Sequence, residues 1–224
     1  MPSSLVALDV AILLPPDTTT SVELLNEQLE APPGGFRFDQ RHLPHISLVQ
    51  QFSPTADLNA IQHTIERVLS EHPPFELTLA SVVVNETTSA LTVTPSSVRD
   101  GLHRRLMDQL AVFDVGVGDK DAFIGNETDP VTSARTRDIT WVSRFRTEAA
   151  YDEFTPHVTL GVGALKAMAS PATFTASALA LCLLGRFCTC QEILASWELL
   201  TRLSDLLLMS VKVFSGRRLS LIHI

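Results

Sequence analysis

The chain has 224 residues, of which 45% are hydrophobic and 19% are charged, so it is long enough to bury a core in one large domain or in two compact lobes. Its net charge of −8 argues against a protein dedicated to duplex DNA, because such proteins normally present a broad basic surface. A small anionic substrate remains compatible with this charge. No apolar stretch approaches the length that spans a bilayer, so we expect no membrane partner.

The first apolar run, residues 5–14, predicts a β-strand. It contains Asp9, lacks a basic segment in front of it and ends in Pro15-Pro16 instead of a small-residue cleavage site. These features distinguish it from a secretory signal. We therefore expect the protein in the cytoplasm.

Three cysteines lie close together near the end of the chain. An odd, clustered set favours free thiols in a reducing compartment over a disulfide framework. A zinc site built from them would need a fourth ligand at suitable spacing, and the sequence has none nearby. We therefore expect no metal at Cys182, Cys188 and Cys190.

Helical and strand-like patterns alternate along the rest of the chain. Apolar residues at helical spacing predict helices that begin near Thr20, Asp57 and Ser97, and a short helix is expected at residues 148–152. Strand-like runs, some separated by turn residues, are expected at residues 45–52, 75–84, 90–94, around 157–160, 174–184 and 189–199.

Five histidines are assigned to ordinary structural or solvent-facing positions, and His63 and His103 are expected to be exposed. The five are His42, His63, His72, His103 and His223.

Two stretches between these elements have no clear periodicity. Residues 116–133 are rich in Gly, Asp, Asn and Thr, which predicts a long surface loop and a candidate lid. An Arg-rich stretch follows, and a solvated loop face is favoured for it over a clamp for an anionic substrate. Its members are Arg135, Arg137, Arg144 and Arg146.

The end of the chain differs from the rest. Residues 200–224 close on Leu-Ser-Leu-Ile-His-Ile, which resembles translated sequencing-adapter read-through. We therefore place the domain at residues 1–199 and interpret residues 200–224 as an atypical tail and a candidate artefact.

One five-residue pattern occurs twice. Pro44-His45-Ile46-Ser47-Leu48 returns as Pro156-His157-Val158-Thr159-Leu160. Because successive side chains of a strand alternate between faces, each segment presents an imidazole and a hydroxyl on one face and two apolar side chains on the other. A histidine followed two positions later by Ser or Thr should occur roughly once by chance here, but the preceding proline and both apolar flanks make two chance matches very improbable.

The duplicated strand predicts the fold class. Two similar α+β lobes are expected, each with a mostly antiparallel sheet and outer helices, related by a pseudo-twofold axis around a central cleft. The polar faces of the two motif strands would line that cleft. No coiled-coil pattern or dedicated interface is visible, so we expect a monomer.

Two imidazoles across a cleft can divide acid and base work, because an unperturbed histidine pKa near 6.5 allows one ring to be neutral while the other is protonated. This division suits phosphodiester cleavage. One histidine takes a proton from water or a ribose hydroxyl, and the other gives a proton to the departing ribose oxygen. The two hydroxyls can donate hydrogen bonds to nonbridging phosphate oxygens. Such a scheme requires no metal or cofactor.

The two motifs, with histidines 112 positions apart, resemble the two-histidine phosphoesterase superfamily, and within it the branch of RNA 2′,5′-ligase-like proteins and 2′,3′-cyclic phosphodiesterases. The resemblance implies a bilobal fold and metal-independent action on 2′,3′-cyclic phosphates or 2′,5′-linked phosphodiesters of nucleotides or RNA. By motif position it implies catalysis by His45 and His157 and phosphate binding by Ser47 and Thr159. Tyr151 and Phe154 are candidate partners for base stacking.

Several alternatives stay open at this stage. The same site could join RNA ends through a 2′,5′ linkage, which is the reverse of phosphodiester opening. Alternatively, the protein could bind nucleotides without turnover. Metal ligation by His45 and His157 is disfavoured, because neither motif carries a carboxylate at a ligand-like spacing. Two purely structural strand histidines are disfavoured by the duplication. The sequence does not decide which histidine is the acid and which is the base.

Overall fold

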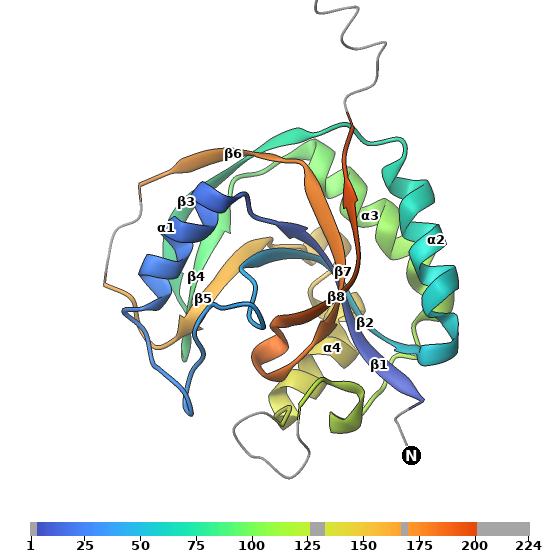
Figure 1. Ribbon diagram of the computed structural model, residues 1–224, viewed down its shortest axis with the longest axis horizontal. Coiled ribbons are helices and arrows are strands. Elements are labelled where there is room, and N and C mark those ends of the chain that lie inside the picture. The colour runs from blue at the N-terminus through green and yellow to red at the C-terminus, as the bar shows by residue number, and fades with distance from the viewer. Residues whose placement is uncertain (1–3, 126–132, 167–169, 201–224) are drawn as a thin grey trace, which may run out of the picture.

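The computed structural model describes residues 4–125, 133–166 and 170–200, and it contains two four-stranded antiparallel sheets (Figure 1). The first sheet has the order β2-β1-β7-β8 and the second has the order β5-β4-β3-β6. The first consists of β1 (Leu5–Leu13), β2 (His45–Pro54), β7 (Ala178–Leu184) and β8 (Cys190–Glu198). The second consists of β3 (Phe75–Val84), β4 (Thr88–Val93), β5 (His157–Val162) and β6 (Ala172–Ala176).

The two motif strands occupy equivalent places. Each lies at the edge of its sheet, β2 next to β1 and β5 next to β4, and the two edge strands contact each other. Both also show the predicted alternation: Ile46 and Leu48 in β2, like Val158 and Leu160 in β5, are fully buried in the main core. The predicted α+β fold with two related lobes is therefore confirmed. The two repeated strands lie at sheet edges that face each other, where the lobes meet.

Helices surround the sheets. Helix α2 (Leu58–Leu69) packs on α3 (Ser97–Leu110), and α3 packs on β2, while α1 (Pro16–Asn26) packs on β5. These three helices lie at the periphery of the molecule (Figure 1). Helix α4 (Thr136–Glu148) contacts β2. Ile61, Ile65 and Val68 form the buried apolar stripe of α2. Because the buried positions recur at helical spacing, the sequence pattern predicted this helix.

Two helix predictions need correction. Helix α1 starts at Pro16 and not near Thr20, because proline suits the first turn, where its missing N–H group would have no helical partner. The predicted short helix at residues 148–152 is instead the end of α4 and a single 3₁₀ turn, Tyr151–Glu153. The start of α4 is stabilised by the backbone N–H of Arg135, which donates to Asp138 Oδ2 over 2.9 Å.

The expected strand at residues 174–184 is also two strands. β6 ends at Ala176 in one sheet, and β7 begins at Ala178 in the other. The chain crosses between lobes at Ser177, whose carbonyl accepts from the N–H of Leu199. No glycine or proline marks this crossing, so the apolar pattern continues through it.

The predicted surface loop at residues 116–133 is partly packed. Ala122 and Phe123 are buried, with the Phe123 ring edge-on to Phe52, and the N–H of Ile124 donates to the Leu184 carbonyl. This part is a loop with one 3₁₀ turn, Lys120–Ala122, so the loop is confirmed but its expected surface position is wrong for Ala122 and Phe123. Residues 126–132, in the second half of the candidate lid, lie outside the described residues, as do residues 201–224 of the predicted tail. Within the described ranges, no helix is long and apolar enough to cross a membrane.

Candidate active site

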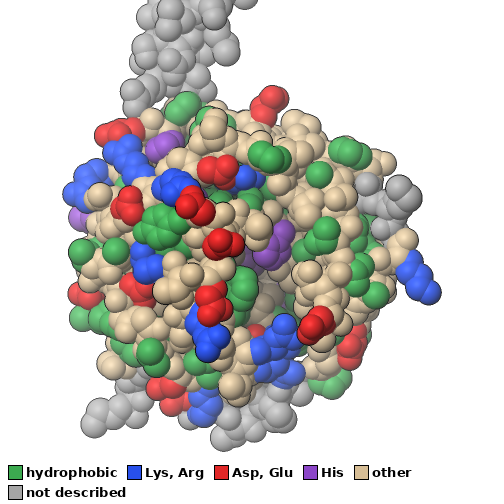
Figure 2. All heavy atoms as spheres, turned by 180° about the vertical axis from the view of Figure 1, so that it is seen from behind, with side chains coloured by type: hydrophobic (Ala, Val, Ile, Leu, Met, Phe, Trp, Pro, Cys, Tyr) green, Lys and Arg blue, Asp and Glu red, His purple; other side chains and the backbone are tan. Residues whose placement is uncertain are grey.

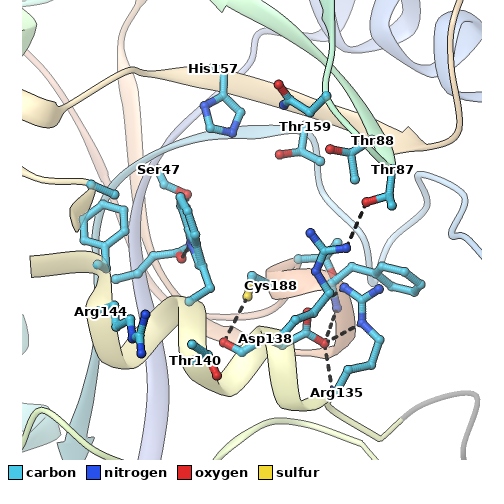
Figure 3. A pocket seen from close by; sticks show the side chains of 18 of the residues that line it. Ser47, Thr87, Thr88, Arg135, Asp138, Thr140, Arg144, His157, Thr159 and Cys188 are labelled. Atoms are coloured by element: carbon cyan, nitrogen blue, oxygen red, sulfur yellow. Dashed lines mark hydrogen bonds and ion pairs between the residues drawn. The ribbon is translucent and has the colours of Figure 1, made fainter. Parts of the chain in front are cut away.

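A cavity of about 840 Å³ is lined by residues of both motif strands, of the β3–β4 turn and of α4. One face of the molecule is hollowed beside a histidine, with basic side chains nearby (Figure 2). The cavity brings together all four predicted motif residues, His45, Ser47, His157 and Thr159. In the close view, His157 and Thr159 project into it opposite α4 (Figure 3).

Both histidine rings are oriented by the same kind of hydrogen bond to a backbone carbonyl. His45 Nδ1 lies 2.7 Å from the carbonyl oxygen of Leu43, and His157 Nδ1 lies 2.8 Å from that of Thr155. Because a carbonyl oxygen only accepts hydrogen bonds, each Nδ1 carries the proton and donates it. The Nε2 atom of each ring is therefore the nitrogen left for proton transfer. In each case the anchor is the backbone two residues before the histidine.

The surroundings of His45 contain a buried carboxylate that the sequence analysis did not identify as functional. Asp9 on β1 is fully buried, and its Oδ2 lies 3.5 Å from His45 Nε2. The same oxygen accepts hydrogen bonds from Ser47 Oγ over 2.5 Å and from Gln50 Nε2 over 2.7 Å. Trp141 Nε1 on α4 in turn donates to Gln50 Oε1 over 2.7 Å. A polar chain therefore runs from α4 to the first motif histidine.

Asp9 changes the protonation of its histidine neighbour. Burial acts to lower the pKa of His45, but the hydrogen bond and the negative charge of Asp9, together with smaller contributions from the Leu43 carbonyl and Cys182, outweigh it, and the pKa is raised. The carboxylate thus stabilises the imidazolium form of His45. A charged residue in the middle of the first apolar run was the only sign of this in the sequence.

Hydroxyl groups line the cavity beside the second motif. Thr159 shares it with Thr88, the first residue of β4, and with Thr87 just before it, and all three lie along the same side in Figure 3. Thr87 Oγ1 accepts a hydrogen bond from Arg137 Nη1 over 2.9 Å. This side can offer hydroxyl and guanidinium donors to an anion.

The Arg-rich stretch lies largely on α4 and not on a loop. Arg135, Arg137 and Arg144 line the cavity. The predicted loop is wrong, because Arg137, Arg144 and Arg146 belong to a helix, but the side chains of Arg137 and Arg144 are exposed, as the interpretation expected. Arg135 binds Asp138 through two nitrogens and lies 4.0 Å from the ring centre of Phe187. Arg146 instead stays outside the cavity lining and binds Asp114 Oδ2 and the Met107 carbonyl. The apolar face of α4 was hard to read because these arginines interrupt it.

Of the two aromatic candidates, the structure brings only Phe154 to the cavity. The Phe154 ring stacks on His103, with ring centres 3.7 Å apart. Tyr151 is not among the lining residues, and its hydroxyl donates to Asp108. The lining also contains aromatic residues that the sequence analysis did not single out, namely Phe36, Phe38, Trp141, Phe145 and Phe187.

His103 is buried, and the prediction that it is exposed is wrong. Its Nδ1 donates to the Leu48 carbonyl over 2.6 Å, and its Nε2 accepts from the N–H of Tyr151 over 2.9 Å. Burial lowers its pKa. The neutral ring thus has a hydrogen-bond partner on both nitrogens. His63 on α2 is exposed, as predicted.

One set of potential metal donors also lies here. Donor atoms of Asp9, His45 and Cys190 lie within 4.8 Å of one another. Burial, assisted by Cys182 and Asp9, raises the pKa of the Cys190 thiol well above its ordinary value. All three cysteines are free in the structure, as predicted.

Comparison with known proteins identifies the family. A family model for the 2′-5′ RNA ligase superfamily matches residues 27–183. The chain therefore belongs to that superfamily, and the resemblance inferred from the two motifs is confirmed. No curated protein matches the chain.

Solved structures share the fold. Escherichia coli LigT complexed with NADP⁺ superimposes with a TM-score of 0.53 at 15% identity, covering 88% of this chain and 99% of that chain. TT0787 of Thermus thermophilus superimposes with a TM-score of 0.52 at 13% identity, covering 86% of this chain and 97% of that chain. A phosphoesterase gives 0.50 at 16% identity, covering 87% and 98%. At such identities the likeness establishes the two-lobed fold.

Proposed function

We propose that the protein is a phosphodiesterase that hydrolyses 2′,3′-cyclic phosphate or 2′,5′-phosphodiester bonds of nucleotides or RNA by metal-independent acid–base catalysis. The observation that carries the proposal is the pair of histidines on adjacent edge strands. Each donates from Nδ1 to the carbonyl two residues earlier and keeps Nε2 for proton transfer. Crystal structures of E. coli LigT contain phosphate, 3′-AMP or ATP, which supports a nucleotide ligand.

In this proposal His45 is the general acid and His157 is the general base. The Asp9 carboxylate lies beside His45 Nε2 and favours a proton there, whereas the only partner described for the His157 ring is a backbone carbonyl. His157 takes a proton from the attacking water, whose oxygen forms a bond to phosphorus. The bond from phosphorus to one ribose oxygen breaks, and His45 gives that oxygen its proton. The product is a phosphomonoester with a free neighbouring hydroxyl.

The two motif hydroxyls have different work in this scheme. Thr159 donates to a nonbridging phosphate oxygen and stabilises charge that grows in the transition state. Ser47 already donates to Asp9, and a hydroxyl has a single proton. Ser47 therefore binds phosphate only after its hydroxyl rotates away from the carboxylate. Arg137, together with Thr87 and Thr88, supplies further donors along the same side.

The remaining cavity wall fits a nucleotide base. Phe154 and the other aromatic lining residues provide flat apolar surface for stacking. The arginines of α4 suit the phosphate end of the ligand. We accordingly propose nucleotides or RNA ends with a 2′,3′-cyclic phosphate as ligands, a monomeric enzyme and, from its free thiols, a reducing cytoplasmic location.

Joining of RNA ends through a 2′,5′ linkage is the second candidate, because it is the reverse of phosphodiester opening and because the family model carries that name. The test supplies the purified protein with 2′,3′-cyclic nucleotides, a 2′,5′-linked dinucleotide and RNA ends, all with EDTA present. Hydrolysis unaffected by EDTA supports the proposal. Joined products alone would favour the ligase. Abolition by EDTA would refute metal-independent catalysis, and silence on every substrate would leave a binding module.

A further inference from the structure

We propose that Asp9, His45 and Cys190 form an inhibitory binding site for a zinc-like divalent cation beside the catalytic cavity, which His45 lines. The inference rests on the proposed function, since inhibition follows from occupying the catalytic nitrogen of His45. Donor atoms of the three residues already lie within 4.8 Å of one another. Ligands around a tetrahedral zinc ion are separated by about 3 to 4 Å, so small side-chain movements bring them into range.

The three potential ligands come from different strands of the first sheet. Asp9 lies on β1, His45 on β2 and Cys190 on β8, three of the four strands of the first sheet. The fourth strand, β7, places Cys182 opposite Asp9 in register, and Cys182 shares a hydrogen bond with Cys190. The backbone N–H of Leu43 donates to the Cys190 carbonyl over 3.1 Å, which holds the segment before His45 against β8. Strands distant in the sequence thus converge on one point.

The second observation concerns the unused oxygen of Asp9. Its Oδ2 accepts from Ser47 and Gln50, but its Oδ1 is buried and has no hydrogen-bond partner among the described residues. A buried carboxylate is costly unless it is paired or coordinates a cation. Oδ1 is therefore an oxygen ligand that the fold has left available, on a carboxylate that lies beside the thiol and the imidazole.

The donor chemistry selects the kind of cation. One nitrogen, one oxygen and one sulfur suit zinc, which accepts all three, and exclude the hard cations magnesium and calcium, which prefer oxygen. Three protein ligands leave a fourth tetrahedral position, and His45 lines the cavity, so a water molecule or a phosphate oxygen can complete the set. Coordination displaces the thiol proton of Cys190, which leaves to solvent.

Occupation would stop catalysis. A cation on His45 Nε2 takes the lone pair that would carry the transferred proton, so the ring can no longer act as an acid. The sequence-based expectation of no metal depended on the absence of a fourth ligand near the cysteines along the chain. The candidate ligands come instead from β1 and β2, more than a hundred residues away along the chain.

The test combines binding and inhibition. Cadmium is titrated into the tag-free protein and the ultraviolet absorption of the cadmium–thiolate bond is recorded for the wild type, Cys190→Ser and Cys188→Ser. Cys188 is the matched control, because it lies in the cavity wall near Asp138 but outside the donor cluster. We expect a saturable band for the wild type and Cys188→Ser and its loss in Cys190→Ser. Zinc should inhibit hydrolysis reversibly. In Cys190→Ser, the zinc concentration that gives half-maximal inhibition should rise by about tenfold or more.

Asp9→Asn provides a second variant in case Cys190→Ser disturbs the core, and it should also weaken cadmium binding. Wild-type protein that binds no cadmium, or a Cys190→Ser band equal to that of the wild type, would overturn the proposal. The cadmium band needs no enzymatic turnover. An inactive protein with an intact band would therefore count against the phosphodiesterase alone, and an active protein without a band would count against the metal site alone.

Discussion

The two motif strands, β2 and β5, are alike in backbone and different in surroundings. Each lies at a sheet edge, buries two apolar side chains and anchors its histidine on the carbonyl two residues before. However, His45 faces the buried Asp9 carboxylate, while the described partner of His157 is the Thr155 carbonyl. The repeat therefore provides two similarly placed imidazoles, and residues outside the repeat make them unequal.

The hydroxyls repeat this contrast. Ser47 is bound to Asp9 within a chain that continues through Gln50 to Trp141. Thr159 lies along one side of the cavity with Thr88 (Figure 3). The first motif is thus organised around a buried charge, and the second lies beside further hydroxyl groups. Substitutions can separate these two roles.

The largest effect is expected from the histidines. His45→Ala and His157→Ala should each lower kcat/KM for 2′,3′-cyclic nucleotides by about a hundredfold or more, because each removes one proton-transfer group. Steady-state kinetics measures this. His63→Ala on the exposed face of α2 is the control and should retain wild-type activity. Near-normal turnover by either motif variant would break the paired mechanism.

The hydroxyls should differ next. Thr159→Val should lower kcat/KM by about a hundredfold, since it removes a donor to the transition-state phosphate while keeping the side-chain shape. Ser47→Ala should cost about tenfold or less, because its hydroxyl is committed to Asp9. The same assay compares the two. Equal losses would show that Ser47 binds phosphate as Thr159 does.

The outer end of the Asp9 chain should have a smaller effect. Trp141→Phe removes the donor to Gln50 Oε1 while preserving an aromatic wall, and should reduce kcat by about threefold, the size expected from one lost hydrogen bond. Because Trp141 also lines the cavity, KM for a small cyclic nucleotide serves as the internal reference. A change in KM with constant kcat would assign Trp141 to substrate contact alone.

His103 offers a contrast to His45 in stability. Its folded-state pKa is lowered by burial, so as pH falls below about 6.5 the unfolded chain binds a proton first and the free energy of unfolding decreases. Urea unfolding of the wild type and of His103→Gln at a series of pH values measures the difference. The variant should lose part of this acid dependence. Identical pH profiles would contradict a neutral, buried His103.

Local patterns predicted the motif strands and their inward apolar residues, because a period of two is visible within five residues. They could not reveal Asp9 as a partner of His45, since that contact depends on the pairing of β1 with β2. They also missed α4, whose apolar positions are interrupted by arginines, and the crossing at Ser177, which no turn residue marks. The exposure of His103 was wrongly predicted for a related reason: its contacts come from the Leu48 carbonyl on β2 and from the Phe154 ring before β5.

The most direct test of unequal histidines compares leaving groups. A p-nitrophenyl ester of a nucleoside 3′-phosphate releases a phenolate that needs no proton, whereas a cyclic phosphate must release a ribose oxygen that does. If His45 is the acid, His45→Ala should lose about a hundredfold on the cyclic phosphate but stay within about tenfold of the wild type on the ester. His157→Ala should be impaired on both. Rescue of His157→Ala in place of His45→Ala would reverse the assignment and contradict the role given to Asp9.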